Sequence, residues 1–212
     1  YWWEFAPFPA AGYSSDLGFQ YGALCDIYYY SDNAHRKREY LHKFNFEAAW
    51  ITKGSGLFHL FYDSKYLIPK IRTTFAASYL PNKMMSFYGF NGYPQGYDDN
   101  RSAGFYAYSR DMLRIMADFQ WSIGGAWNLA AGATFWNFDN GRVGLKKYSG
   151  ETTLYDIYLR DGIIRSDEAT GGSQLELKAG IVYDTRDHEA DPLQGIWAEA
   201  IAYGSPDLIE RH

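Results

Sequence analysis

Only a few residues of this sequence have types and spacings that could do chemistry. Asp184 and Arg186 are two positions apart and could act as an acid–base pair, but a structural ion pair is the more common use of this spacing. Residues 98–100, Asp-Asp-Asn, have the composition of a calcium loop, yet a solvated turn is their ordinary explanation. His59 and Asp63 could share a ligand, whereas hydrogen bonding within the protein is the more common role of such a histidine. None of these patterns by itself indicates a reaction.

The common catalytic signatures are absent from the sequence. It contains no Gly-x-Ser-x-Gly elbow, no phosphate-binding loop and no paired metal ligands. The lone Cys25 cannot form an intrachain disulfide, and no Cys/His spacing suits zinc. We therefore predict that the protein is not an enzyme and that it holds no cofactor and no metal.

The composition narrows the class of protein. The 212 residues allow one or two domains, and 47% hydrophobic content excludes a disordered chain. A net charge of −5 argues against a nucleic-acid partner, which would require a basic surface. The 20 Tyr, 14 Phe and 7 Trp exceed what a water-soluble core needs. The most apolar window, 119–138, contains three glycines, and a mean hydropathy of −0.40 speaks against membrane helices.

Apolar and polar residues alternate with period two along most of the chain, which is typical of β-strands. The charged residues of these strands share one face of each strand, together with Gly, Ala, Ser and Thr. Strands with one apolar and one polar face occur both in soluble sandwiches and in outer-membrane barrels. Small residues among the charges, aromatic residues near strand ends and long strands favour the barrel. We expect nine strands, at residues 5–13, 17–30, 43–51, 57–65, 71–79, 104–121, 127–135, 175–183 and 196–202.

The connections between these strands are expected to differ in length at the two ends of the sheet. Those at 15–17, 53–56, 81–103 and 139–172 fall at one end, which faces the cell exterior if the chain enters from the periplasm. Those at 31–39, 68–70, 122–125 and 187–194 fall at the other end.

The longest connection is predicted to contain a short helix. Thr153 can cap it, with Asp156 three residues on as in a capping box, and Gly162 can end it. Leu154, Ile157 and Tyr158 would form its packed side.

One string of residues resembles a known family. Tyr183-Asp184-Thr185-Arg186-Asp187, followed by Pro192 and Gly195, resembles the signature turn of the bacterial surface-antigen (BamA/TamA) superfamily of outer-membrane β-barrels. Pro192 and Gly195 suit a rigid turn, and Asp184 and Arg186 have the parity to pair inside a barrel. Residues 11–19 are similar to the first hairpin of that family, and 87–92 to a loop of its shorter members.

The resemblance implies a fold and a cellular place. Barrels of the family have sixteen strands, and the signature turn follows the eighth. The chain is thus expected to be all-β, about nine N-terminal strands of a sixteen-stranded transmembrane antiparallel barrel. It would be one barrel domain over 1–212, incomplete at its C-terminus, where 210–212 lack a terminal aromatic residue, and without periplasmic repeat domains. A complete barrel of eight or ten strands is the alternative. Outer-membrane lipid of a Gram-negative bacterium is the expected surrounding.

The resemblance also implies a function. Family barrels act in insertion, assembly or translocation of other proteins, with a weak seam between first and last strands. Pro7 and Pro9, with Gly12 and Tyr13 in the same strand, would weaken that seam because proline cannot donate to a β-ladder. Other outer-membrane or periplasmic proteins would be the partners. The alternatives are a non-catalytic barrel that anchors or scaffolds a surface complex, a passive pore, and the barrel half of a fused patatin-type lipase with its nucleophile upstream of Tyr1.

Overall fold

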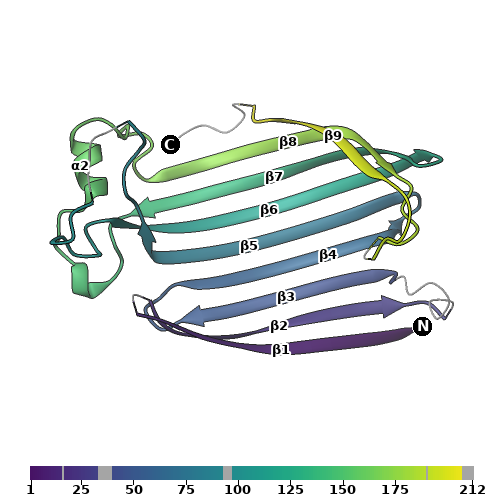
Figure 1. Cartoon of the computed structure of the whole chain (residues 1–212), viewed down its shortest axis with the longest axis horizontal. Helices are drawn as coiled ribbons and strands as arrows, with labels where there is room; N and C mark the ends of the chain where they lie inside the picture. Colours follow the sequence, from purple (N-terminus) through teal and green to yellow (C-terminus); the bar gives the residue numbers. More distant parts are fainter. Residues whose placement is uncertain (16, 33–39, 93–96, 190, 207–212) are drawn as a thin grey trace.

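A computed structural model describes residues 1–15, 17–32, 40–92, 97–189 and 191–206 of the chain. These residues form nine strands of one antiparallel sheet, and the strands lie side by side in sequence order (Figure 1). The all-β, antiparallel prediction is therefore confirmed. The strands are β1 (Trp2–Ser14), β2 (Gly18–Tyr30), β3 (His42–Ile51), β4 (Gly56–Ile68), β5 (Ile71–Ser86), β6 (Ala107–Gly124), β7 (Trp127–Gly141), β8 (Gly171–Asp184) and β9 (Trp197–Gly204).

The sheet is open, with β1 and β9 as its two edges. Each inner strand pairs with both of its sequence neighbours, and the two longest connections lie at the same end of the sheet, as predicted (Figure 1). Parts of four predicted connections fall outside the described residues, namely position 16, residues 33–39, residues 93–96 and position 190, as do the chain-end residues 210–212.

Several strand boundaries differ from the prediction: β7 runs on to Gly141 and β8 begins at Gly171, six and four residues beyond the predicted ends. Strand β5 continues through Pro81 to Ser86, where the sequence predicts a loop. Pro81 is tolerated because β4 already ends its pairing with β5 at Tyr79, so no partner strand needs the missing N–H on that side. Strand β6 begins at Ala107 instead of 104, because the chain before it is bent into a turn by the bond from the Phe105 N–H to the Ser102 carbonyl oxygen.

The strand register places the charged side chains on one face of the sheet. Lys43, Asp63, Asp118 and Lys178 belong to one row of residues that oppose each other from β3 to β8. On the same face, a Cβ atom added at Gly180 would lie 2.2 Å from the carbonyl oxygen of Ala200 on β9. Neighbouring backbone thus bends over this face, which we call the inner face. The opposite, apolar face is the outer face.

A small hydrophobic cluster joins the two longest connections. Helix α2 (Leu154–Arg160) begins at Thr153 with the predicted capping box, and Leu154, Tyr155 and Tyr158 are buried in it. The Leu154 N–H donates to the carbonyl oxygen of Phe105 in the β5–β6 connection. We call this unit the cap; its buried residues are Phe105, Tyr106, Leu154, Tyr155, Tyr158 and Ile164.

A 3-10 turn, η1 (Lys146–Tyr148), precedes α2 in the same connection. No helix that the structure describes is long and apolar enough to span a membrane.

Candidate functional site on the inner face

The turn between β8 and β9 contains the string that resembles the family signature. Thr185 closes it: its N–H donates to the Ile196 carbonyl oxygen at 2.9 Å, and its hydroxyl accepts from the Ile196 N–H at 2.8 Å. Tyr183 comes before the turn, on β8, and its ring packs 4.8 Å from that of Trp127 on β7. Pro192 is exposed at the far side of the turn.

The carboxylate of Asp187 organises the interior of the turn. It accepts from the backbone N–H groups of His188, Leu193 and Gln194 at 2.9, 3.0 and 3.2 Å. These bonds, that from Gln194 first, lower the pKa of Asp187 below its ordinary value. Gly195 has φ of +108°, and a Cβ there would lie 2.4 Å from the Thr185 carbonyl oxygen, so only glycine fits without strain.

Asp184 and Arg186 form the ion pair that their spacing predicts. The guanidinium is bidentate, with Nε 2.9 Å and Nη2 2.8 Å from the two carboxylate oxygens. The same guanidinium lies over the ring of Trp197 at the start of β9, 5.8 Å from its centroid. The pair therefore ties the end of β8 to the beginning of β9.

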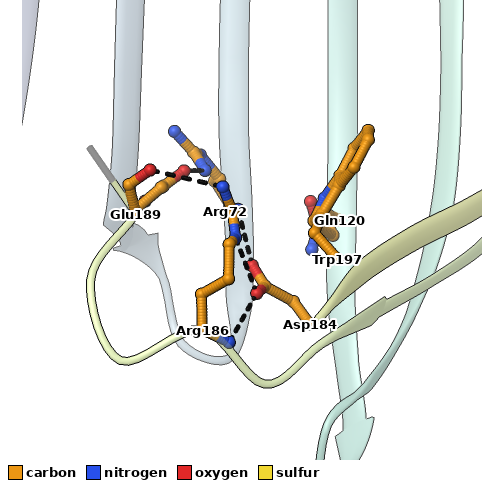
Figure 2. Close-up of a pocket in the computed structure, with 6 residues that line it drawn as sticks. All are labelled: Arg72, Gln120, Asp184, Arg186, Glu189 and Trp197. Carbon is orange, nitrogen blue, oxygen red and sulfur yellow. Dashed lines mark hydrogen bonds and ion pairs between the residues drawn. The ribbon is translucent and has the colours of Figure 1, made fainter. Parts of the chain in front are cut away.

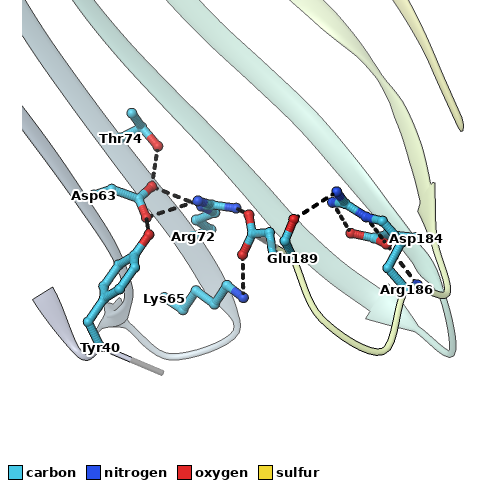
Figure 3. A network of polar contacts seen from close by, with 8 residues as sticks. All are labelled: Tyr40, Asp63, Lys65, Arg72, Thr74, Asp184, Arg186 and Glu189. Atoms are coloured by element: carbon cyan, nitrogen blue, oxygen red, sulfur yellow. Dashed lines mark hydrogen bonds and ion pairs between the residues drawn. The ribbon is translucent and has the colours of Figure 1, made fainter. Parts of the chain in front are cut away.

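The turn also crosses the inner face and binds strands that are distant in sequence. Glu189 forms ion pairs with Lys65 of β4, at 2.8 Å, and with Arg72 of β5 (Figure 3). Strands β6 and β7 lie between β5 and β8, so the turn spans the inner side of both. Burial raises the pKa of Glu189, but bonds and charges from Lys65 and Arg72 outweigh it, and the net pKa is lowered.

Asp63 is the buried centre of this network. Its side chain is 2% exposed, and it accepts from Arg72 Nε at 2.8 Å and Nη2 at 3.0 Å. The hydroxyl groups of Tyr40 and Thr74 each donate to it at 2.8 Å (Figure 3). Four donated bonds satisfy the carboxylate, which would otherwise be costly to bury.

The weaker chemical candidates have structural roles. His59 does not bind Asp63; its Nδ1 lies 2.8 Å from the Ser78 hydroxyl on β5, as expected of a hydrogen-bonded residue. Asp98 accepts from the backbone and side-chain nitrogens of Asn100, each at 2.9 Å, which is a turn geometry. Within the described ranges, no three His, Cys, Asp or Glu side chains gather to hold a metal.

A cavity of about 330 Å³ adjoins the network (Figure 2). Its charged groups are matched in number and sign, and each is bound to a neighbour by the contacts above. The arrangement can hold the β8–β9 turn in place against the inner face of the sheet. The cavity is lined by Arg72, Gln120, Asp184, Arg186, Glu189 and Trp197.

The proposed seam residues lie on the edge strand β1. The β1–β2 register is unbroken from Trp2–Tyr30 to Ser14–Gly18 and includes Pro7 and Pro9. Alternate residues of an antiparallel strand direct their N–H groups to the same side, so an unbroken ladder places both proline nitrogens on the free edge. Gly12 has room for a Cβ, 3.8 Å from Gln20, and Tyr13 is 79% exposed.

The sequence reasoning missed the partners of the turn. Sequence patterns do not mark Glu189, Lys65, Arg72 and Tyr40 as a set, although Lys65 and Arg72 have inner-face parity. The available signal was Glu189 itself, a further acidic residue in a turn whose other acids, Asp184 and Asp187, bond within the turn. The partners of Glu189 could not be predicted, because they depend on how far the turn extends across the inner face of the sheet.

The fold of the chain is similar to that of a solved protein, whereas its sequence has no match. No family model matches the chain, and no curated protein sequence matches it. Its fold is similar to the crystal structure of BamA from Haemophilus ducreyi lacking POTRA domains 1-3, with a TM-score of 0.47 and 13% identity. The likeness covers 98% of this chain, which spans 34% of the length of that chain.

Proposed function

We propose that this chain forms part of the wall of a transmembrane β-barrel in the bacterial outer membrane. The observation that carries the proposal is that apolar side chains are more exposed than charged ones, the reverse of what water-soluble proteins show. On the outer face Ile115 and Ile181 are 49% and 43% exposed, while the inner side chains of Lys178 and Asp63 are only 22% and 2% exposed. In water this arrangement is unfavourable, whereas hydrocarbon outside the sheet would make it favourable.

The distribution of aromatic residues supports the same surrounding. Trp3, Trp121 and Trp127 are exposed near one end of the sheet, and Tyr21 and Trp50 near the other. Amphipathic rings prefer the two interfaces of a bilayer, where an apolar body and a polar tip are both satisfied. An apolar band between two aromatic rows is the pattern of membrane barrels, and a packed sandwich has no need of it.

Matched arginine substitutions test the membrane proposal. Ile115→Arg would place a charge in lipid and cost about 2–4 kcal/mol of folding free energy in vesicles. Gln174→Arg, in the next row but on the inner face, is the control and should cost much less. The measurement is denaturant unfolding of the chain in phospholipid vesicles, followed by tryptophan fluorescence. Equal costs for the two variants, or a stable monomer in detergent-free buffer, would refute the proposal.

Within this class we propose a role in the insertion or translocation of other proteins. Its support is the signature-like string at 183–187 with Pro192 and Gly195, and the edge strand β1 with two donors missing from its free side. An edge that pairs weakly can release its partner and accept an incoming strand. Such an exchange needs no catalytic side chain, in keeping with the ion pairs that bind the charged groups around the β8–β9 turn.

Photocrosslinking distinguishes this role from the alternatives. Crosslinkers placed at Phe5, Phe8 and Tyr13 should capture nascent outer-membrane proteins in living cells. The same crosslinker at Tyr88, beside the cap, is the control and should not capture them. Capture of a fixed partner at Tyr88 alone would favour an anchoring or scaffolding barrel. Ion conductance without capture at either site would favour a passive pore.

A further inference from the structure

Two arginines on the inner face differ from the other arginines that the structure describes. Arg110 and Arg114, both on β6, have no carboxylate oxygen of a described residue within ion-pairing distance. Each of the remaining described arginines has such a partner. They are Arg72, Arg101, Arg142, Arg160, Arg165 and Arg186.

Aromatic rings of β7 hold these two guanidinium groups. Arg110 lies 4.2 Å from the ring centroid of Phe138, and Arg114 lies 5.1 Å from that of Trp136. The two rings are themselves stacked, with centroids 6.0 Å apart and planes 11° apart. Stacking fixes a guanidinium by its face and leaves its in-plane N–H donors free to bind an anion at two points.

The N–H donors of both guanidinium groups have few hydrogen-bond acceptors among the described residues. Arg114 Nη2 contacts only the sulfur of Met116, at 3.1 Å, and a thioether is a weak acceptor. The Nε atoms of Arg110 and Arg114 are buried and have no hydrogen-bond partner. Two positive charges are thus fixed on one strand, and it is their terminal N–H groups that can reach a ligand, because the Nε atoms are buried.

The side chains that oppose the two arginines in their own rows are neutral, and several of them are amides. Arg110 is opposed by Asn82 on β5 and Asn140 on β7, while Arg114 is opposed by Ser78 and Trp136. Gln174 on β8 continues the second row. No acid occupies these positions between β5 and β8, in contrast to the other end of the sheet, where Asp63, Glu189 and Asp184 bind every nearby arginine.

We propose that this strip binds an extended, acidic polypeptide segment along β6. Four residues of a strand span about 13 Å, so carboxylates at positions i and i+4 of an extended peptide would reach Arg110 and Arg114 together. The amide of Gln174 offers a donor and an acceptor, and the amide of Asn82 offers a donor, since its Oδ1 already accepts from the Met84 N–H at 3.0 Å. Together they match peptide groups, whereas a polyphosphate offers acceptors only. The inference rests on the proposed function, because it requires passing polypeptides at an inner face open to water.

Peptide titration of the whole chain in detergent micelles tests the proposal. Hexaglutamate is long enough to reach both arginines and diglutamate is not, so hexaglutamate should bind at least about tenfold more tightly. Arg110→Gln with Arg114→Gln should remove about tenfold or more of that affinity. Arg110→Lys with Arg114→Lys should restore it only in part, because lysine cannot bind a carboxylate at two points. Arg160→Gln, on the exposed face of α2, is the control and should leave the affinity unchanged.

Three results would overturn the proposal. They are equal affinity for the two peptides, hexaglutamate binding that survives loss of both arginines, and binding of polyphosphate without binding of hexaglutamate. Circular dichroism of each variant shows whether it remains folded, and thermal melting gives its stability. The two proposals can fail separately. A failed hexaglutamate titration does not affect the comparison of Ile115→Arg with Gln174→Arg, and that comparison is made in vesicles without any peptide.

Discussion

The ammonium group of Lys178 on β8 lies 2.6 Å from the carboxylate of Asp118 on β6, directly over Gly132 on the strand between them. The three residues belong to one row of the inner face, and only a glycine in the middle lets the outer two meet. A Cβ at Gly132 would lie 2.1 Å from Asp118 Oδ1 and 2.9 Å from the Ala117 carbonyl oxygen. Opposite charges two strands apart thus join three strands across the inner face.

Gly132→Ala should destabilise the protein. The added methyl group separates Lys178 from Asp118 and leaves two partly buried charges without each other, which costs about 1–3 kcal/mol. The measurement is the unfolding free energy in vesicles from urea titration. Gly12→Ala is the matched control, because its Cβ would meet only ordinary contacts, and its cost should be near zero. Equal effects of the two substitutions would contradict this role of Gly132.

Glu189→Gln should loosen the β8–β9 turn from β4 and β5. The amide keeps the size of the side chain but loses the ion pairs with Lys65 and Arg72. Because the Glu189 side chain is 37% exposed and screened by solvent, the expected loss is about 0.5–1 kcal/mol at pH 7. The measurement is the difference in thermal unfolding midpoint between the variant and the unmodified chain.

The same difference should depend on pH in a defined direction. The native pKa of Glu189 is below its ordinary value of 4.5, so its contribution is fully present above that value. It is lost as the pH falls through the native pKa, and the two proteins should then unfold at the same temperature. Other carboxyl groups titrate in both proteins and cancel in the comparison. A difference that grows on acidification would show that the pairing of Glu189 is not stabilising.

Asp187→Ala should open the turn to proteases. Removing the carboxylate leaves the N–H groups of His188, Leu193 and Gln194 without their shared acceptor. Asp187→Asn retains an acceptor oxygen, so its rate of cleavage between 187 and 195 should lie between those of the unmodified chain and the alanine variant. Limited proteolysis with mass spectrometry measures the rates. An alanine variant cleaved no faster than the unmodified chain would exclude this organising role.

Replacing Pro7 and Pro9 with valine should raise the thermal stability of the reconstituted protein. The two substitutions restore N–H donors on the free edge of β1, where a pairing strand can accept them. Ala11→Val is the control, since it adds a β-branched side chain of the same parity without adding a donor. An unchanged unfolding temperature in the double variant, or an equal rise in the control, would remove the seam interpretation.

The alternation of single residues was enough to predict the sheet, its nine strands and its charged face. A period of two leaves each strand only two choices of face, and the capping box from Thr153 to Asp156 specified the start of α2 in the same local way. The bidentate pair of Asp184 and Arg186 also followed from spacing, because both side chains come from adjoining positions on one side of the chain.

The tertiary structure alone decided which distant groups meet. Glu189 is 117 positions from Arg72, and their contact depends on the lean of a turn across two intervening strands. The approach of Lys178 to Asp118 and the stacking of Arg110 and Arg114 on β7 depend on register, which accumulates over every connection. Local alternation specifies the face of the sheet on which a residue lies. Which residue lies beside it on that face depends on the register of every strand pair between them, and sequence patterns do not specify those registers.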